Sequence, residues 1–174
     1  MKILVTLTPG ELREAATGGV DRRISAILDN RKGRRHEQIP LERQNWWQSD
    51  IIGAIGEYAV SKAFGRSWSP TIGRIDQADV AKWQVRSTES LNPKLRVRLH
   101  DHVDDLFILA QVRNHKILLH GYLPGREVRK QGAEEYEGVW AVTSDLLYLI
   151  SDLPEDIAWG NGVDLWTPKP AQIG

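Results

Sequence analysis

The sequence predicts an α/β fold, a mixed central β-sheet flanked by helices, with an N-terminal helical extension. Two near-continuous apolar runs, 106–112 and 117–123, have the length and composition of buried central strands. Together with a strand pattern over 95–100, they predict an antiparallel meander of three strands. The 174 residues, 41% of them hydrophobic, are enough for one sizeable core and too few for two ordinary domains. We therefore expect a single domain over 1–174.

Three helices are expected before these strands. A capping-box sequence at 8–11, with proline at the first helical position, predicts a helix that runs to about Thr17. The pair Gly18-Gly19 is expected to interrupt it, and apolar residues at helical spacing predict a second helix over 20–30. A third, strongly apolar helix is expected over 51–65, capped by the polar residues just before it and ended by a glycine.

The expected domain has three parts. Residues 1–48 form the helical extension and 49–123 the core, with helices on both faces of its sheet. Residues 124–174 form a mixed C-terminal segment, for which the sequence predicts a helical turn over 126–131, an edge strand over 139–142 and a capped helix from Ser144 or Asp145.

Composition excludes several classes of protein. The chain has no cysteine, which excludes disulfides, thiolate zinc sites and a cysteine nucleophile. No stretch approaches the ~18 apolar residues of a membrane span, and Pro9 interrupts the opening apolar residues before a signal-peptide core could form. We therefore expect a cytoplasmic protein with no membrane contact.

Charge is unevenly distributed although the formal net charge is zero. Residues 1–100 carry 17 Lys and Arg against 11 Asp and Glu, whereas 101–174 carry 6 against 12. Only the first part therefore has the basic character of a surface that contacts phosphates. Its basic run, 31–36, is either such a surface or a solvated loop.

Glu57 is the most informative residue of the third helix. Gly53 and Gly56 lower helix stability, which indicates a face where another backbone or a ligand comes close. At helical spacing Glu57 lies beside that face, so its carboxylate points toward the packed side and needs a partner. It either pairs with a nearby arginine, extends to solvent, or belongs to a functional site.

A strand with polar residues on one face follows that helix. Over 83–88, side-chain alternation places Gln84, Arg86 and Thr88 on the same face. With Glu57 before it and Asp79 between the two elements, the order of these residues resembles that of the PD-(D/E)XK phosphodiesterase superfamily, including its small phage-encoded members.

The resemblance covers 49–123 and implies a restriction-endonuclease-like fold. It implies that Mg²⁺ or Mn²⁺ is bound by Glu57, Asp79, Gln84 and the backbone carbonyl of Val85. Arg86 takes the place of the lysine that orients the attacking water in the superfamily. It also implies a prokaryotic or phage-infected host cell.

Two of these positions depart from the superfamily pattern. Gln84 replaces an acid, and although an amide oxygen can bind a metal, the site loses one negative charge. Arg86 replaces lysine, and a guanidinium can hold a phosphate but cannot act as a base. The short gap between Asp79 and Gln84 leaves Asp76 as the alternative aspartate.

The expected function is that of a Mg²⁺-dependent DNA endonuclease in which water attacks the phosphodiester. The alternative is a catalytically inactive protein of the same fold that binds nucleic acid or a protein partner. A homodimer is a further expectation, because nucleases that cut both strands often pair two sites by two-fold symmetry. A third interpretation is an unrelated α/β protein whose motif match is coincidental. Residues expected to contact DNA are Arg34, Arg35, Lys94, Arg96 and Arg98.

Overall fold

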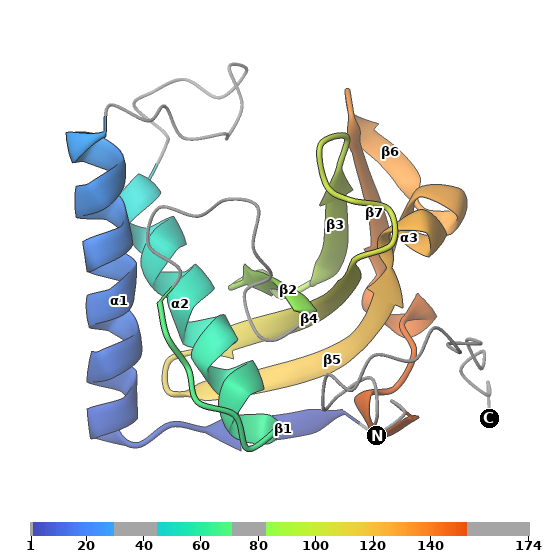
Figure 1. Ribbon diagram of the computed structural model, residues 1–174. Coiled ribbons are helices and arrows are strands. Elements are labelled where there is room, and N and C mark those ends of the chain that lie inside the picture. Colours follow the sequence, from blue (N-terminus) through green and yellow to red (C-terminus); the bar gives the residue numbers. More distant parts are fainter. Residues whose placement is uncertain (1, 30–44, 71–82, 153–174) are drawn as a thin grey trace.

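The structure is a computed structural model that describes residues 2–29, 45–70 and 83–152 (Figure 1). It confirms the α/β class that the sequence predicts, and it consists of an N-terminal pair of helices, a mixed four-stranded sheet and a small antiparallel sheet. No helix in the described ranges is long and apolar enough to cross a membrane. In chain order the elements are β1 (Ile3–Thr6), α1 (Pro9–Leu28), α2 (Trp46–Ala63), β2 (Trp83–Thr88), β3 (Lys94–Arg98), β4 (Leu106–Arg113), β5 (Lys116–Pro124), α3 (Gly125–Gln131), β6 (Ala133–Tyr136), β7 (Val139–Thr143) and the 3-10 turns η2 (Ser144–Leu146) and η3 (Ile150–Asp152).

The larger sheet has the strand order β1-β5-β4-β2. β4 and β5 form the predicted antiparallel hairpin and are its two central strands, as their apolar sequences indicate. β2 lies parallel to β4, and β1, which the sequence analysis did not predict, pairs with β5. The predicted three-strand meander is wrong, because β3 leaves this sheet and pairs with β7.

The smaller sheet has the order β3-β7-β6. β7 was expected to be an edge strand, and this is wrong because it has a partner on each side. α3 confirms the predicted helical turn, whereas the helix expected from Ser144 or Asp145 is only the short turn η2. In Figure 1 the smaller sheet stands at the end of the larger one that is remote from α1 and α2.

α1 is one continuous helix, so the break predicted at Gly18-Gly19 is wrong. A Cβ atom on Gly19 would lie 2.6 Å from the Cα of Ile51 and 2.8 Å from the carbonyl oxygen of Asp50, so these two helices come too close for a side chain at this position. The space that a Cβ atom on Gly18 would need is likewise occupied by the ring of Trp68. Tertiary packing therefore explains the glycine pair better than helix termination does.

α2 begins earlier than predicted. Asn45 caps it by accepting a hydrogen bond from the backbone N–H of Gln48 at 3.2 Å, and Gly65, with φ of +61°, follows its C-terminal end. A Cβ atom on Gly56 would clash with Ser87 of β2, which confirms the close approach predicted there. Gly53 has room for a Cβ atom, so the same prediction is wrong at that position.

One continuous core joins both sheets to the helices. α2 covers one face of the larger sheet, where Trp83 stacks against Phe64 and meets Tyr122 edge to face. The smaller sheet and α3 contribute Leu95, Val97, Val128 and Val142 to the same core. Helices were predicted on both faces of the sheet, and this is confirmed for the face that α2 covers. The smaller sheet and the short helix α3 lie beside the rest of the core.

Gly19→Ala and Gly53→Ala test this reading of the helix contact. We expect Gly19→Ala to destabilise the fold by about 1–3 kcal/mol, since the new methyl group has no room. Gly53→Ala, whose new methyl group would make only ordinary van der Waals contact, 3.6 Å from Nη1 of Arg22, should be neutral or stabilising by up to about 1 kcal/mol through its higher helix propensity. Urea unfolding measures both, and equal effects of the two variants would contradict the close approach at Gly19.

Candidate functional site

Glu57 is buried between α1 and α2, with 3% of its surface exposed. Arg22 of α1 grips its carboxylate with two parallel hydrogen bonds, from Nη1 to Oε1 at 2.8 Å and from Nη2 to Oε2 at 2.7 Å. A second pair links the same helices, from Nε of Arg23 to Oδ2 of Asp50 at 2.6 Å. Glu57 therefore has the arginine partner that one sequence interpretation expected, and both of its oxygens are engaged.

Gln84 and Arg86 point away from α2. Ser87, their neighbour in β2, faces α2, since its hydroxyl donates to the carbonyl oxygen of Gly53 at 3.5 Å and its side chain lies against Gly56. Because side chains alternate along a strand, Gln84 and Arg86 share the opposite face, as predicted. Glu57 therefore lies on one side of the larger sheet, and this polar pair is directed to the other.

On that opposite face, two aspartates of the β3–β4 loop hold the polar residues of β2. Gln84 donates from Nε2 to Oδ2 of Asp105 at 3.3 Å, and Arg86 donates from Nη2 to Oδ2 of Asp101 at 2.8 Å. The Arg86 guanidinium also lies 4.8 Å from the ring centroid of Phe107. Sequence reasoning missed both aspartates, although the three acidic residues between β3 and β4 are a visible signal.

These positions test the metal site that the resemblance implies. Glu57 and Gln84 do not converge, and a guanidinium already engages the Glu57 oxygens that would bind Mg²⁺. Asp79 and its alternative, Asp76, lie outside the described residues, and Val85 belongs to the β2 ladder. The described members of the predicted set therefore do not fit a shared Mg²⁺ ion.

The basic residues of β3 meet a carboxylate from β6. Lys94 donates from Nζ to Oε1 of Glu135 at 2.6 Å, and Arg96 donates from Nε to Oε2 of the same residue at 2.7 Å. Burial alone would raise the pKa of Glu135, but the hydrogen bonds from Lys94 and Arg96 outweigh it and hold the pKa below its ordinary value. Arg98 falls on the same strand face by alternation. Arg34 and Arg35 lie outside the described residues.

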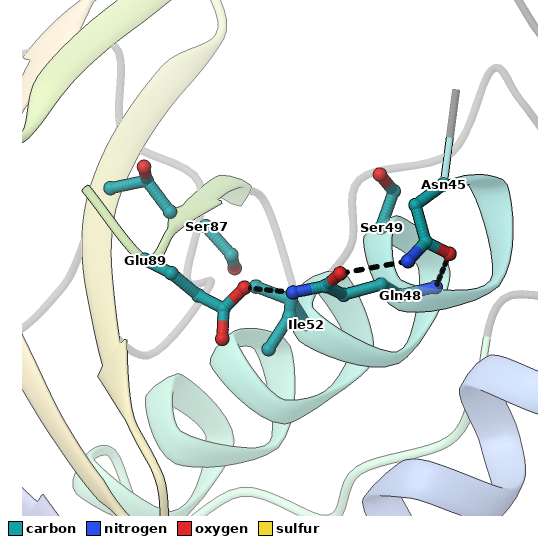
Figure 2. A pocket seen from close by; sticks show the side chains of 7 residues that line it. Asn45, Gln48, Ser49, Ile52, Ser87 and Glu89 are labelled. Carbon is teal, nitrogen blue, oxygen red and sulfur yellow. Dashed lines mark hydrogen bonds between the residues drawn. The ribbon is translucent and has the colours of Figure 1, made fainter. Parts of the chain in front are cut away.

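A polar cavity of about 290 Å³ lies between the start of α2 and the end of β2. Figure 2 shows Gln48 between two partners: its amide oxygen accepts from Asn45 at 2.9 Å, and its nitrogen donates to Glu89 at 2.5 Å. The amides and hydroxyls around this cavity could hydrogen-bond a small polar molecule. Its lining is Asn45, Gln48, Ser49, Ile52, Ser87, Thr88 and Glu89.

A buried histidine is a further polar group that the sequence did not single out. His120 of β5 is 5% exposed, and its Nε2 lies 3.0 Å from Oε1 of Gln111. Gln111 donates its own nitrogen to the carbonyl of Ser90 at 2.6 Å, so its oxygen accepts and the proton of His120 is on Nε2. Burial, with the positive charge of Lys2, lowers the pKa of His120 to about 4.

Together, the fold and these polar groups define an α/β protein with two features. The Glu57 carboxylate of α2 forms a buried ion pair with Arg22 of α1, and strand β3 carries a row of basic side chains. Comparison of the chain with family models, with curated proteins and with solved structures finds no match in any of the three.

The Arg22–Glu57 pair can be tested by removing one partner or both. Arg22→Met leaves a buried carboxylate without its cation and should cost roughly 3–5 kcal/mol of unfolding free energy. The double variant Arg22→Met with Glu57→Leu should recover most of that loss, because an apolar pair replaces a buried ion pair at little cost. Arg13→Met, at an exposed position of the same helix, should stay within about 0.5 kcal/mol. Equal effects of Arg13→Met and Arg22→Met would contradict a structural pair.

His120 predicts a pH dependence of stability. Its folded pKa of about 4 lies below the ordinary value of 6.5, so between these values the unfolded chain takes up a proton that the folded chain does not. The contribution of neutral His120 to the free energy of unfolding is fully present above pH 6.5. It is lost as the pH falls toward 4, by about 1 kcal/mol per pH unit. His120→Gln keeps a donor for Gln111 without titrating. As the pH falls through this window, the unfolding free energy of wild type should decrease relative to that of the variant, and parallel profiles would contradict the assignment.

Proposed function

We propose that this chain binds nucleic acid through phosphate contacts on β3, without the metal-dependent cleavage that its sequence resemblance to the PD-(D/E)XK superfamily implies. The observation that carries the proposal is the convergence of Lys94 and Arg96 on one anionic group. Side chains two residues apart on a strand share one face, so the two cations can bind one anion between them. They hold the Glu135 carboxylate in the way that they would hold a nucleic-acid phosphate. β3 is an edge strand, so a partner can approach it without opening the sheet.

The surroundings of Glu57 favour binding over cleavage. A carboxylate that serves as a metal ligand must offer free oxygen lone pairs, whereas both Glu57 oxygens accept from one guanidinium. Exchanging that guanidinium for a metal ion would break both of its hydrogen bonds to Glu57, whose side chain is only 4% exposed. The helix pair is therefore better explained as a structural device of a binding protein.

A second candidate is the Mg²⁺-dependent DNA endonuclease that the resemblance implies. The observation in its favour is the polar cluster on the other sheet face, where Gln84 and Arg86 meet Asp105 and Asp101. This cluster brings carboxylates, an amide and a cation together at the start of β2 and β4. In this candidate it would provide the carboxylates in place of Glu57.

The binding proposal predicts salt-dependent affinity for a short fluorescent DNA duplex, measured by anisotropy between about 50 and 200 mM salt. Lys94→Ala with Arg96→Ala should weaken binding and lower the slope of log affinity against log salt by about 2. Arg113→Ala with Lys116→Ala removes the same charge from the exposed β4–β5 turn and should change the slope less. Equal losses in both double variants would contradict a site on β3.

Incubation of the protein with several forms of DNA in the presence of Mg²⁺ or Mn²⁺ separates the two candidates. The binding proposal predicts intact linear, supercoiled and single-stranded DNA after incubation. Cleavage that disappears in Gln84→Ala and in Asp105→Ala would instead establish the nuclease, since both residues belong to the polar cluster on the other sheet face.

A further inference from the structure

We propose that Lys94 and Arg96 form a phosphodiester-binding site whose anion position is held in the free protein by Glu135, and that a nucleic-acid phosphate displaces this carboxylate. The inference rests on the proposed function and deepens it, because it names the group bound and the residue that competes for it. The ion pairs of Lys94 and Arg96 with Glu135 are the starting point.

Glu135 lies on the face of the smaller sheet that carries Lys94 and Arg96. Arg96, Ala141 and Ala133 are aligned across β3, β7 and β6, so their side chains share one face. Glu135 comes two residues after Ala133, and strand alternation directs it to that same face. It stands at a β-bulge, since Glu134 lies opposite Trp140 and Tyr136 opposite Val139, so Glu135 has no partner in the ladder. Its carboxylate can therefore reach toward β3, from which its own strand is separated by β7.

The neighbouring residues leave room for this reach. Arg96 lies opposite Ala141 on β7, and Ala141 in turn lies opposite Ala133 of β6. The short alanine side chains leave space above β7 for the longer arms of Glu135 and Arg96 to meet. The contact is thus made across the middle strand by side chains alone, and it can open without breaking a backbone hydrogen bond of the sheet.

A carboxylate is a close chemical substitute for a phosphodiester. Each presents two anionic oxygens in a fork, and here each carboxylate oxygen accepts from a different cation. Two cations face one negative charge, so an excess positive charge is left to attract an incoming phosphate.

The site is also open to solvent on one side. The side chains of Lys94 and Arg96 are 39% and 41% exposed, and that of Glu135 is 20% exposed. A phosphate can therefore reach the two cations while Glu135 swings out into water, and exchange requires no change in the sheet itself.

The test compares Glu135→Gln with Glu137→Gln in the DNA-binding assay. Glu137 lies in the exposed turn after β6, and its substitution changes the net charge by the same amount two residues away. We expect Glu135→Gln to tighten binding roughly tenfold, the effect of about one hydrogen bond to a charged group, and to steepen the salt slope. Glu137→Gln should tighten it less than about twofold, because it releases no paired cation. In the Lys94→Ala, Arg96→Ala background, Glu135→Gln should bring no gain.

These outcomes separate the inference from the function it rests on. If wild type binds DNA and the two glutamine variants behave alike, the competition by Glu135 is overturned and the binding function stands. If wild type and every variant fail to bind, both are overturned.

A second measurement needs no variant that might unfold. The side-chain carboxyl carbon of Glu135 can be titrated by NMR in the free protein and at saturating DNA. Displacement removes the two cations from the carboxylate, so its titration midpoint should move up when DNA binds. An unchanged midpoint at saturation would overturn the inference.

Discussion

A buried carboxylate between two helices is the constraint on which the rest of the structure depends. Glu57 is almost fully removed from water, and only a partner of opposite charge with matching geometry makes that burial tolerable. The two-pronged contact with Arg22 supplies it and fixes how α1 lies on α2. With α1 held there, Gly19 must stay small, and Gly56 lets α2 settle on β2.

This arrangement separates residues that lie close in the sequence pattern. Once α2 covers one face of the larger sheet, strand alternation directs Gln84 and Arg86 to the other, where Asp105 and Asp101 hold them. The order of residues that resembles a nuclease is therefore divided between a structural ion pair and a separate polar cluster. The basic strand β3 presents two cations that a carboxylate from its own sheet engages, and in our proposal a nucleic-acid phosphate takes the place of that carboxylate.

Much of the fold could be predicted from local sequence, because long apolar runs and capping signals do not depend on distant residues. Several of the misjudged parts depend on distant contacts. Gly18-Gly19 has the local character of a break, but Trp68 and the helix α2, both far along the chain, require the small residues. The need of Glu57 for a partner was visible, whereas the identity of Arg22 was not, since 35 positions separate the two. The contact of Glu135 with β3 depends on the strand order β3-β7-β6, which sequence periodicity does not reveal.

The central claim, that Glu57 is a structural residue held by Arg22 and not a metal ligand, is tested most directly by a crystal soaked in Mn²⁺. Anomalous scattering locates the metal without reference to activity. We expect no anomalous peak at Glu57 and an Arg22 guanidinium still within hydrogen-bonding distance of both carboxylate oxygens. A peak coordinated by Glu57 together with Gln84, with Arg22 turned away, would contradict it.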